Sequence, residues 1–378
     1  MICSIAGKSP AIALALALGD NRRGMGHSDE KASFLDGLRG LAALIVVFGH
    51  CSNAGIHVVP GLNLALIAKI GVWTFFVLSA YLLGRKLLEE LESDADVSRV
   101  MAAYAIRRVL RILPLYYVFL ALLFATGAMD SAGLWRHALL IDGREHFWTI
   151  PVEMKFYAVL PFVLMLLIMV PPRLRVLLWA GVSLASVAAY YLFIPPPRIG
   201  IAGNPVTLLN YATFFCAGIM VVLIGPLAPR RHYLAVPVGI VALAFVVALS
   251  PRPFVQISSL LGWPLSHADV VDLYWLEALA LGAAFVALLS LPRFRPLEAM
   301  PMRFFGRVSF GMYLTHWFVI PIVVKSAWVP ETGKGLTALV ATVIVATICY
   351  YAIERPMLTL GAAWASDLHQ ARIAYRPG

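Results

Sequence analysis

The chain has 378 residues, of which 61% are hydrophobic and only 13% charged, and its formal net charge is +10. A soluble domain averages about a quarter charged residues, so this composition excludes a soluble globular protein. Lys and Arg gather in short segments between apolar runs, so the charge indicates membrane topology rather than binding to nucleic acid. Four cysteines (Cys3, Cys51, Cys216 and Cys349) lack metal-ligand spacing, and we expect neither a disulfide framework nor a metal site.

Residues 1–30 precede the first apolar run of membrane length. The apolar stretch 10–18 is too short to span a bilayer. Three interpretations stay open: a disordered or interfacial leader, an incorrectly assigned start with the true start at Met25, or a cleaved signal peptide. We exclude this segment from the expected fold.

Ten apolar runs follow, each about long enough to cross a hydrocarbon core of roughly 30 Å. They are 36–57, 64–84, 112–129, 148–170, 176–194, 206–225, 234–250, 270–291, 306–325 and 336–353. The most basic connections fall on one side if the N-terminus is inside. The sequence therefore predicts an all-α transmembrane bundle of about ten spans over 31–356, with both termini cytoplasmic and a short tail at 357–378.

The first run carries three side chains that hydrocarbon solvates poorly. Asp36 and Arg39 are spaced i, i+3 and can pair on one helix face. Arg39 and His50 are 11 residues apart, which places them on nearly the same face about 16 Å apart. This stripe suits a site that binds an anionic group at the surface and transfers protons in the interior. The alternatives are an ordinary charged helix start and a structural histidine.

A second polar cluster stands at the predicted cytoplasmic start of the third span. Arg108 and Arg111 share a helix face, and guanidinium groups bind phosphate oxygens bidentately. Arg39 is expected on the same membrane face, which favours a joint anion site. The alternative is simple anchoring by the positive-inside rule.

The fourth span opens with a third cluster, in which Glu153 and Tyr157 are spaced i, i+4. We expect Glu153 to lie at a depth where it can meet His50, and a carboxylate there would fix the tautomer of a general base. Alternatively, Trp148 and Tyr157 are interfacial aromatics, and Glu153 pairs with Lys155 or faces water.

The ninth span contains Ser309, Tyr313 and His316 at i, i+4 and i+7, which forms a single stripe. It supplies a second intramembrane histidine, with helix–helix hydrogen bonding as the alternative role. Glu354, at the end of the tenth span, either orients an arginine or caps the bundle. The chain lacks the nucleotide-binding motif G-x-x-x-x-G-K-[ST] and the nucleophile elbow G-x-S-x-G.

These clusters, in this order, resemble the acyltransferase 3 family of bacterial integral-membrane acyltransferases. The matching stretches are 35–44 continuing to His50, 75–82, 108–111, 147–157 and 309–316. The resemblance implies a polytopic enzyme that moves an acyl group, usually acetyl, from cytoplasmic acyl-CoA to a hydroxyl of a sugar or cell-surface glycan. It implies acyl-CoA as co-substrate with no bound cofactor, and a place in the inner membrane of a bacterium.

The resemblance also implies residue roles. The essential histidine of the family matches His50, and the arginine of its Arg-x10-His spacing matches Arg39. The arginine pair that meets the donor phosphates matches Arg108 and Arg111. The acidic residue of its Trp-Ser-Leu-x-x-Glu pattern matches Glu153, although this chain has Thr149 where the family has serine, which leaves the role of that position open.

Two other classes of function fit the same polar residues. A transporter or flippase for a glycan or a lipid-linked precursor would also bury histidines and a carboxylate. Against it, the sequence shows neither repeated halves nor paired Gly/Pro-broken helices. A membrane scaffold would not need Arg39 and His50 on one helix face.

Overall fold

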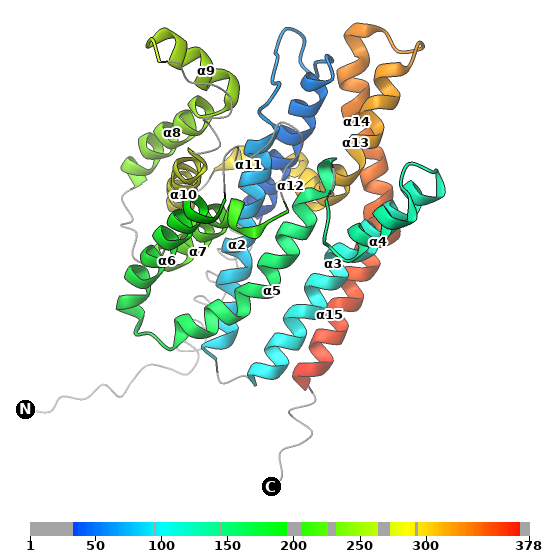
Figure 1. The fold of residues 1–378 in the computed structure, drawn as a ribbon. Coiled ribbons are helices and arrows are strands. Elements are labelled where there is room, and N and C mark those ends of the chain that lie inside the picture. The colour runs from blue at the N-terminus through cyan, green and yellow to red at the C-terminus, as the bar shows by residue number, and fades with distance from the viewer. Residues whose placement is uncertain are drawn as a thin grey trace, which may run out of the picture.

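The structure is a computed structural model that describes residues 33–93, 96–143, 145–194, 206–225, 232–263, 273–291 and 294–370. Within these ranges the chain forms helices and connecting turns without a strand (Figure 1). The predicted all-α class is therefore confirmed. The segment 1–30, for which three interpretations were open, lies outside the described residues.

The helical elements follow one another with short connections. In chain order they are an N-terminal helix Ser33–Asn53, α2 Ala68–Leu91, α3 Val97–Ala125, α4 Ser131–Ala138, η1 Glu145–Trp148, α5 Thr149–Ile168, α6 Pro172–Phe193, η2 Leu208–Tyr211, α7 Ala212–Ile224, α8 His232–Ala248, α9 Pro251–Leu260, α10 Tyr274–Ser290, α11 Arg295–Glu298, α12 Met300–Arg307, α13 Ser309–Lys325, η4 Glu331–Gly333, α14 Lys334–Cys349, the π-helical turn η5 Tyr350–Glu354, and α15 Arg355–Gln370.

Each of the ten predicted apolar runs coincides with a helix or a bent pair of helices. Among the described residues, six helices are long and apolar enough to cross a membrane, or up to eight if each of two bent pairs is one span. The bent pairs are Leu234–Ala248 with Pro253–Leu260, at 86°, and Met300–Arg307 with Ser309–Lys325, at 74°. The two remaining runs form the shorter helices Leu208–Ile224 and Tyr274–Ser290. The structure thus supports a polytopic bundle of six to eight candidate spans.

Helix α3 begins earlier than the sequence predicted. The Asp96 side chain accepts a hydrogen bond from the Ser98 N–H at 2.9 Å and caps the helix, which then runs through the expected loop. Arg108 consequently lies about 16 Å along the helix rather than in its first turn. The predicted tail is also helical as far as Gln370, because α15 packs along α3 and Arg99 Nη1 donates to the Leu368 carbonyl at 3.3 Å.

Glycines let the N-terminal helix cross α11 and α12 in direct backbone contact. A Cβ atom added to Gly37 would lie 1.7 Å from the Leu297 carbonyl oxygen, and one added to Gly306 would lie 1.8 Å from that of Asp36. No larger side chain fits there without moving a helix. The small residues beside Arg39 thus admit a neighbouring backbone, and this contact determines where Arg39 points.

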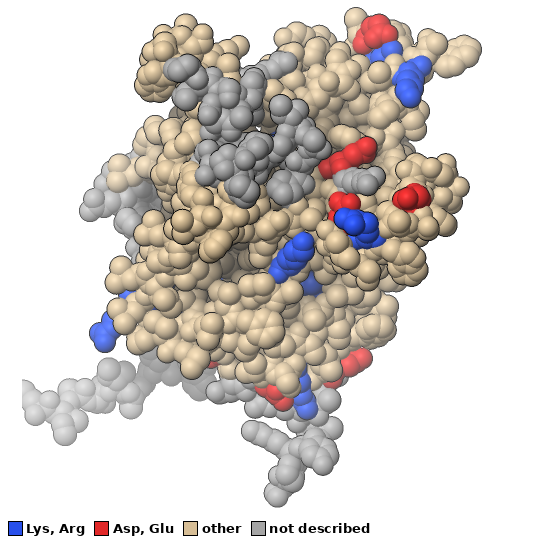
Figure 2. Space-filling model, in the orientation of Figure 1, with Lys and Arg blue, Asp and Glu red and all other residues tan. Residues whose placement is uncertain are grey.

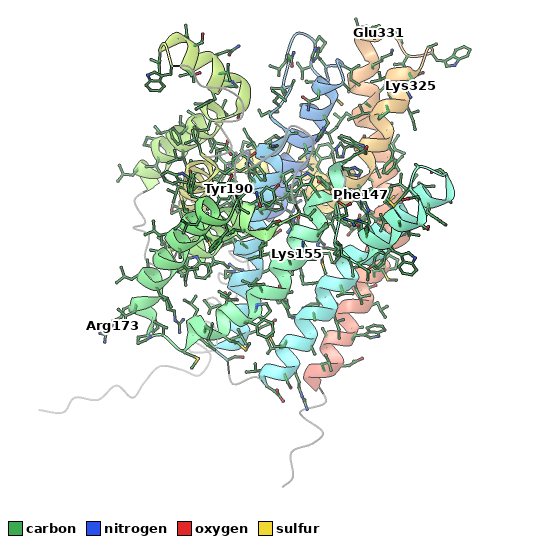
Figure 3. All side chains as sticks on the ribbon, in the orientation of Figure 1. Phe147, Lys155, Arg173, Tyr190, Lys325 and Glu331 are labelled. Atoms are coloured by element: carbon green, nitrogen blue, oxygen red, sulfur yellow. The ribbon has the colours of Figure 1, made fainter. Side chains whose placement is uncertain are left out.

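The middle of the bundle is an aromatic core around α2, α5 and α7. Trp73 stacks on Phe214 with ring centroids 4.5 Å apart, and Phe156 stacks on Phe215 at 4.0 Å. In Figure 3, Phe147, Lys155 and Tyr190 lie at mid-height, whereas Arg173 lies at one end of the bundle and Lys325 and Glu331 at the other. Charged side chains are sparse between the two ends on the face drawn in Figure 2, apart from a group over α4 and the start of α5. This distribution suits a bundle surrounded by lipid.

Candidate active site

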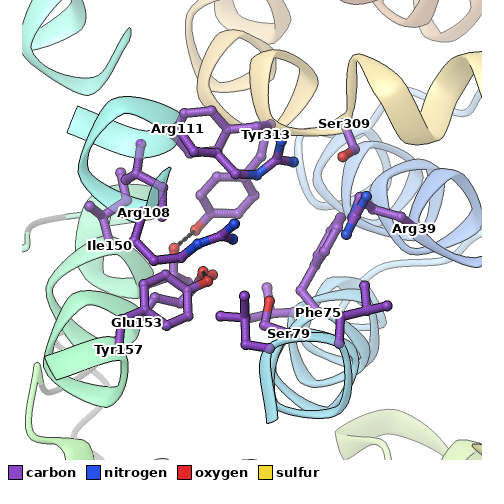
Figure 4. Close-up of a pocket in the computed structure, with 16 residues that line it drawn as sticks. Arg39, Phe75, Ser79, Arg108, Arg111, Ile150, Glu153, Tyr157, Ser309 and Tyr313 are labelled. Atoms are coloured by element: carbon purple, nitrogen blue, oxygen red, sulfur yellow. Dashed lines mark hydrogen bonds between the residues drawn. The ribbon is translucent and has the colours of Figure 1, made fainter. Parts of the chain in front are cut away.

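A pocket of about 90 Å³ lies between the N-terminal helix, α2, α3, α5 and α13. Figure 4 shows the guanidinium groups of Arg39, Arg108 and Arg111 and the carboxylate of Glu153 arranged around one space. These four are the charged residues of the lining, so cations outnumber anions. Three arginines from two helices make this a site for an anionic ligand.

Asp36 and Arg39 form the ion pair that their spacing predicted. Arg39 Nη1 donates to Asp36 Oδ1 at 3.2 Å, and the two side chains are 23% and 42% exposed. A guanidinium group carries five N–H donors, so Arg39 keeps donors for a ligand after this pairing. Arg108 Nε is buried and has no hydrogen-bond partner within the described part of the chain. The pocket therefore offers uncommitted donors.

Glu153 lies with the arginines and not with His50. Tyr157 Oη donates to Glu153 Oε2 at 2.5 Å, and the charged groups that act on this carboxylate are Arg111, Arg39 and Arg108. We expected Glu153 to contact His50, but Glu153 contacts Tyr157 and lies with the arginines, and His50 contacts His316 and Trp317. The physical reason is that α13 inserts Tyr313 beside Glu153, and Tyr313 lines the pocket while His50 does not.

His50, which is half-buried, instead belongs to a cluster of aromatic rings. Its ring centroid lies 5.0 Å from that of His316 and 5.2 Å from that of Trp317. His316 is fully buried, and its Nδ1 lies 3.1 Å from the Met312 carbonyl oxygen. Because a carbonyl only accepts, Nδ1 carries the proton and Nε2 presents a lone pair. The structure thus places His316, which the helical stripe on the ninth span predicted as a second intramembrane histidine, next to His50.

A third histidine, His146, completes the cluster and was missed by the sequence analysis. It is 3% exposed, and its ring stacks on Trp317 with centroids 5.4 Å apart and lies 5.8 Å from the ring of His316. The residue falls in a polar segment between predicted spans, where periodicity carries no information about burial. The single available signal was its place directly before the Phe147–Tyr157 stretch. The short helix η1 turns it inward.

Tyr313 stands between the cationic pocket and the histidine cluster. Its hydroxyl accepts a hydrogen bond from Thr149 Oγ1 at 3.0 Å and donates to the His146 carbonyl oxygen. Its ring lies 5.8 Å from that of His316 and also lines the pocket. A group bound at the arginines therefore has the histidines directly beyond this tyrosine.

The other predicted supporting residues separate into two sets. Ser309 and Tyr157 line the pocket, which excludes the interfacial position considered for Tyr157. Trp148 is a core residue, since its ring lies 4.8 Å from that of Tyr211 and 6.0 Å from that of Trp73. It supports the site by packing and is not one of the residues that line the pocket.

Glu354 lies under the pocket in the π-helical turn η5. It is 2% exposed, neither carboxylate oxygen has a hydrogen-bond partner among the described residues, and Arg111 is the cation that acts on it. Gly311 leaves room for it, because an added Cβ there would lie 3.1 Å from Glu354 Oε1. Of the two roles left open by the sequence, these neighbours favour orientation of an arginine over capping.

A second, larger cavity lies away from these residues. It measures about 700 Å³ and is bounded by α6, α7, α8 and α10, with an uncharged, mostly aliphatic lining. Ser183 and Ser290 in its wall donate to carbonyls of their own helices. Acyl transfer needs acid–base groups, which this lining does not supply. Among the described residues, no group of three or more His, Cys, Asp or Glu side chains is placed to hold a metal ion.

The fold and the site together define a class: a polytopic membrane protein with a cationic pocket beside a group of three histidines. Comparison with known proteins makes this specific. The acyltransferase domain of the acyltransferase 3 family matches residues 33–354, and the chain belongs to that family. It is therefore an acyltransferase, and it transfers groups other than aminoacyl groups.

Several characterised proteins are similar to the chain. Exopolysaccharide production protein ExoZ of Rhizobium meliloti is 27% identical over 79% of this chain and 92% of its own length. Nodulation protein 10 of Rhizobium leguminosarum is 24% identical over 88% and 95%. Peptidoglycan O-acetyltransferase OatA of Listeria monocytogenes is 21% identical over 88% of this chain and 56% of its own length. No solved structure gives a significant match.

Proposed function

We propose that the protein is a multi-pass enzyme of the bacterial inner membrane that transfers an acetyl group from acetyl-CoA to a hydroxyl of a saccharide or cell-surface glycan. The observation that carries this proposal is the pocket of Arg39, Arg108 and Arg111 beside a cluster of buried histidines. The relatives named for exopolysaccharide production and for peptidoglycan O-acetylation support a glycan acceptor.

In this proposal the arginines bind the phosphates of the donor from the cytoplasmic side. Asp36 holds Arg39, while Glu153, Tyr157 and Glu354 surround the guanidinium groups of the α3 pair. A pocket of about 90 Å³ holds only a few water-sized groups, so it accommodates a phosphate or the end of the pantetheine arm rather than a whole coenzyme A. The thioester then lies next to Tyr313, with His50 beyond it.

The chemical step moves the acyl group from the sulfur of coenzyme A to the hydroxyl oxygen of the acceptor. The acceptor hydroxyl attacks the thioester carbonyl carbon, and His50 takes its proton as general base. The carbon–sulfur bond breaks, and the coenzyme A thiolate leaves with the proton that His50 releases. General-base assistance of this kind contributes about 10²–10⁴-fold to the rate. A variant of the mechanism has His50 accept the acyl group first and pass it on.

The test is acyl transfer by the purified protein. We expect His50→Gln to reduce transfer of radiolabelled acetyl from acetyl-CoA to glycan by about 10²–10⁴-fold, because the general base is lost. His57→Gln is the matched control, since His57 is a half-buried loop residue that contacts Ser52 Oγ at 3.4 Å, outside the cluster. Unimpaired transfer by His50→Gln would eliminate the mechanism. A trapped acetyl-histidine at position 50 would identify it as nucleophile rather than base.

A further inference from the structure

The hydrogen-bond donors around His50 are nearly all committed to other groups. Trp317 Nε1 donates to Glu145 Oε2, and Tyr313 Oη donates to the His146 carbonyl oxygen. The N–H of His316 is at Nδ1 and points to the Met312 carbonyl oxygen at 3.1 Å. None of these three donors is available to a substrate oxygen without breaking an existing bond.

His146 is the exception in this cluster. Neither of its ring nitrogens makes a hydrogen bond of ordinary geometry to the described residues, although the Leu314 backbone lies close to the ring. A neutral imidazole always carries one N–H donor and one lone pair. The side chain is 3% exposed, so solvent does not satisfy them either. His146 therefore carries an N–H inside the cluster that makes no well-formed hydrogen bond, with the Leu314 backbone as a close but poorly aligned acceptor.

The chain maintains this arrangement at a cost. Burying an unpaired polar group costs on the order of 1–3 kcal/mol, and such groups are rare in native structures unless they bind a ligand. Glu145, directly before His146, has φ of 52°, a left-handed conformation that non-glycine residues seldom adopt. The bonds from Trp317 and Tyr313 to η1 hold the backbone of His146 in place on both sides.

We propose that His146 is a catalytic residue that donates its N–H to the carbonyl oxygen of the bound thioester and to the oxyanion that forms from it. This inference rests on the proposed acyl transfer. The His316 ring lies 5.0 Å from that of His50 and 5.8 Å from that of His146, so the three rings are neighbours. A donor aimed at developing negative charge is the usual means by which enzymes stabilise the tetrahedral intermediate of acyl transfer.

The three histidines then have distinct parts in one balanced step. The acceptor oxygen forms a bond to the carbonyl carbon while His50 takes the hydroxyl proton. The carbonyl electron pair moves onto oxygen, and the His146 N–H donates a hydrogen bond to the oxyanion that forms. When the electron pair on the oxyanion re-forms the carbonyl double bond, the carbon–sulfur bond breaks. The coenzyme A thiolate then takes the proton from His50. His316 presents only the lone pair of Nε2, which has no hydrogen-bond partner among the described residues, and its ring packs against that of His50.

The experiment compares variants that keep or remove the donor. His146→Phe preserves ring volume without an N–H, and His146→Gln keeps an amide N–H donor. We expect His146→Phe to lower kcat about 10²–10³-fold, as loss of one oxyanion donor does. KM for acetyl-CoA should stay within about twofold, and His146→Gln should recover part of the rate. His57→Phe, outside the cluster, should match the wild type.

A pH profile separates the donor from the base. In wild-type protein kcat should rise with pH as His50 loses its proton and becomes an active base. This rise should persist in His146→Gln and should vanish in His50→Gln. Wild-type kcat in a folded His146→Phe protein would overturn the proposal, as would a rise in KM at unchanged kcat. If the rise of kcat with pH were lost in His146→Gln, His146 would be the general base, and the proposal would be overturned.

Vibrational spectroscopy of the wild-type protein tests the proposal even if His146→Phe does not fold. Acetyl-CoA labelled with ¹³C at the carbonyl should show a C=O stretch at lower wavenumber when bound to the wild type than in solution, because a donor polarises the bond. An unshifted band would overturn the proposal. A wild-type protein without transfer from acetyl-CoA would instead refute the proposed function, whereas an active wild type with an equally active Phe variant would refute only this inference.

Discussion

At the residue scale, the cationic pocket depends on donors that the protein leaves free. Arg108 is mostly buried, its Nε has no partner among the described residues, and it faces the same space as Arg39 and Arg111. Three like charges side by side repel one another, and Glu153 and Glu354 offset part of that repulsion. A bound polyanion would offset the rest, which explains why the protein retains an otherwise unfavourable cluster.

Replacement of Arg108 should weaken donor binding. A hydrogen bond to a charged group contributes about 1.5–3 kcal/mol, so Arg108→Gln should raise the dissociation constant of acetyl-CoA by roughly ten- to a hundredfold. Arg108→Lys keeps the charge without the bidentate fork and should recover part of this loss. The control is Arg85→Gln on α2, because Arg85 is exposed and pairs with Glu89 at 3.6 Å. Isothermal titration with acetyl-CoA measures the change, and equal affinity of Arg108→Gln and wild type would contradict the assignment.

At the element scale, the position of the N-terminal helix against α11 and α12 determines the geometry of the site. The backbones touch where Gly37 and Gly306 remove side chains, and Asp36 and Arg39 flank Gly37 in the same helical turn. The bend of 74° between α12 and α13 then directs Ser309 and Tyr313 into the pocket. A small shift at this crossing would displace the arginine from its partners.

Gly306→Ala tests this crossing. The added Cβ would lie 1.8 Å from the Asp36 carbonyl oxygen, and overpacking of this kind costs about 1–3 kcal/mol. We expect a lower temperature of thermal unfolding in detergent and a weaker response to acetyl-CoA. Gly181→Ala in α6 is the matched control, because no atom lies within 4 Å of its added Cβ. If both variants unfold like the wild type, the close approach of the two helices is wrong.

At the scale of the whole molecule, the face drawn in Figure 2 is largely apolar, with charged side chains at both ends of the bundle and in a group over α4 and the start of α5. On α6, Leu177, Leu184 and Leu192 are between 69% and 77% exposed, which is expected for side chains that face lipid. Helix α15 returns along α3, so that Leu368 lies beside Arg99 near the start of α3. The end of α15 and the start of α3 are therefore at the same end of the bundle.

The predicted topology places that end in the cytoplasm. Fusions of green fluorescent protein to residue 1 and to residue 378 should fluoresce, because this reporter folds in the cytoplasm. Alkaline phosphatase inserted at Gly61, in the connection between the N-terminal helix and α2, should be active, since that connection is predicted on the opposite side. Phosphatase activity from a fusion at either terminus would contradict the topology.

Much of the architecture follows from local properties of the sequence. Apolar length predicts helices that cross a bilayer, because each span must satisfy its own backbone. Helical spacing also predicted the pairing of Asp36 with Arg39 and the joint stripe of Ser309, Tyr313 and His316, since side chains three or four residues apart always share a face. The start of α3 was predicted too late, because a helix boundary depends on a cap at Asp96 that competes with other starts.

Only the tertiary structure decided which polar groups meet. Spacing within one helix does not say how far a neighbouring helix is rotated or shifted, so the sequence assigned Glu153 to His50, whereas packing gives Glu153 to the arginines. Packing likewise brings His146 from an irregular segment against His316 and Trp317. The sequence by itself determined the all-helical, polytopic class and the family. The contacts between helices, which depend on side-chain packing over the whole bundle, decided the composition of the site.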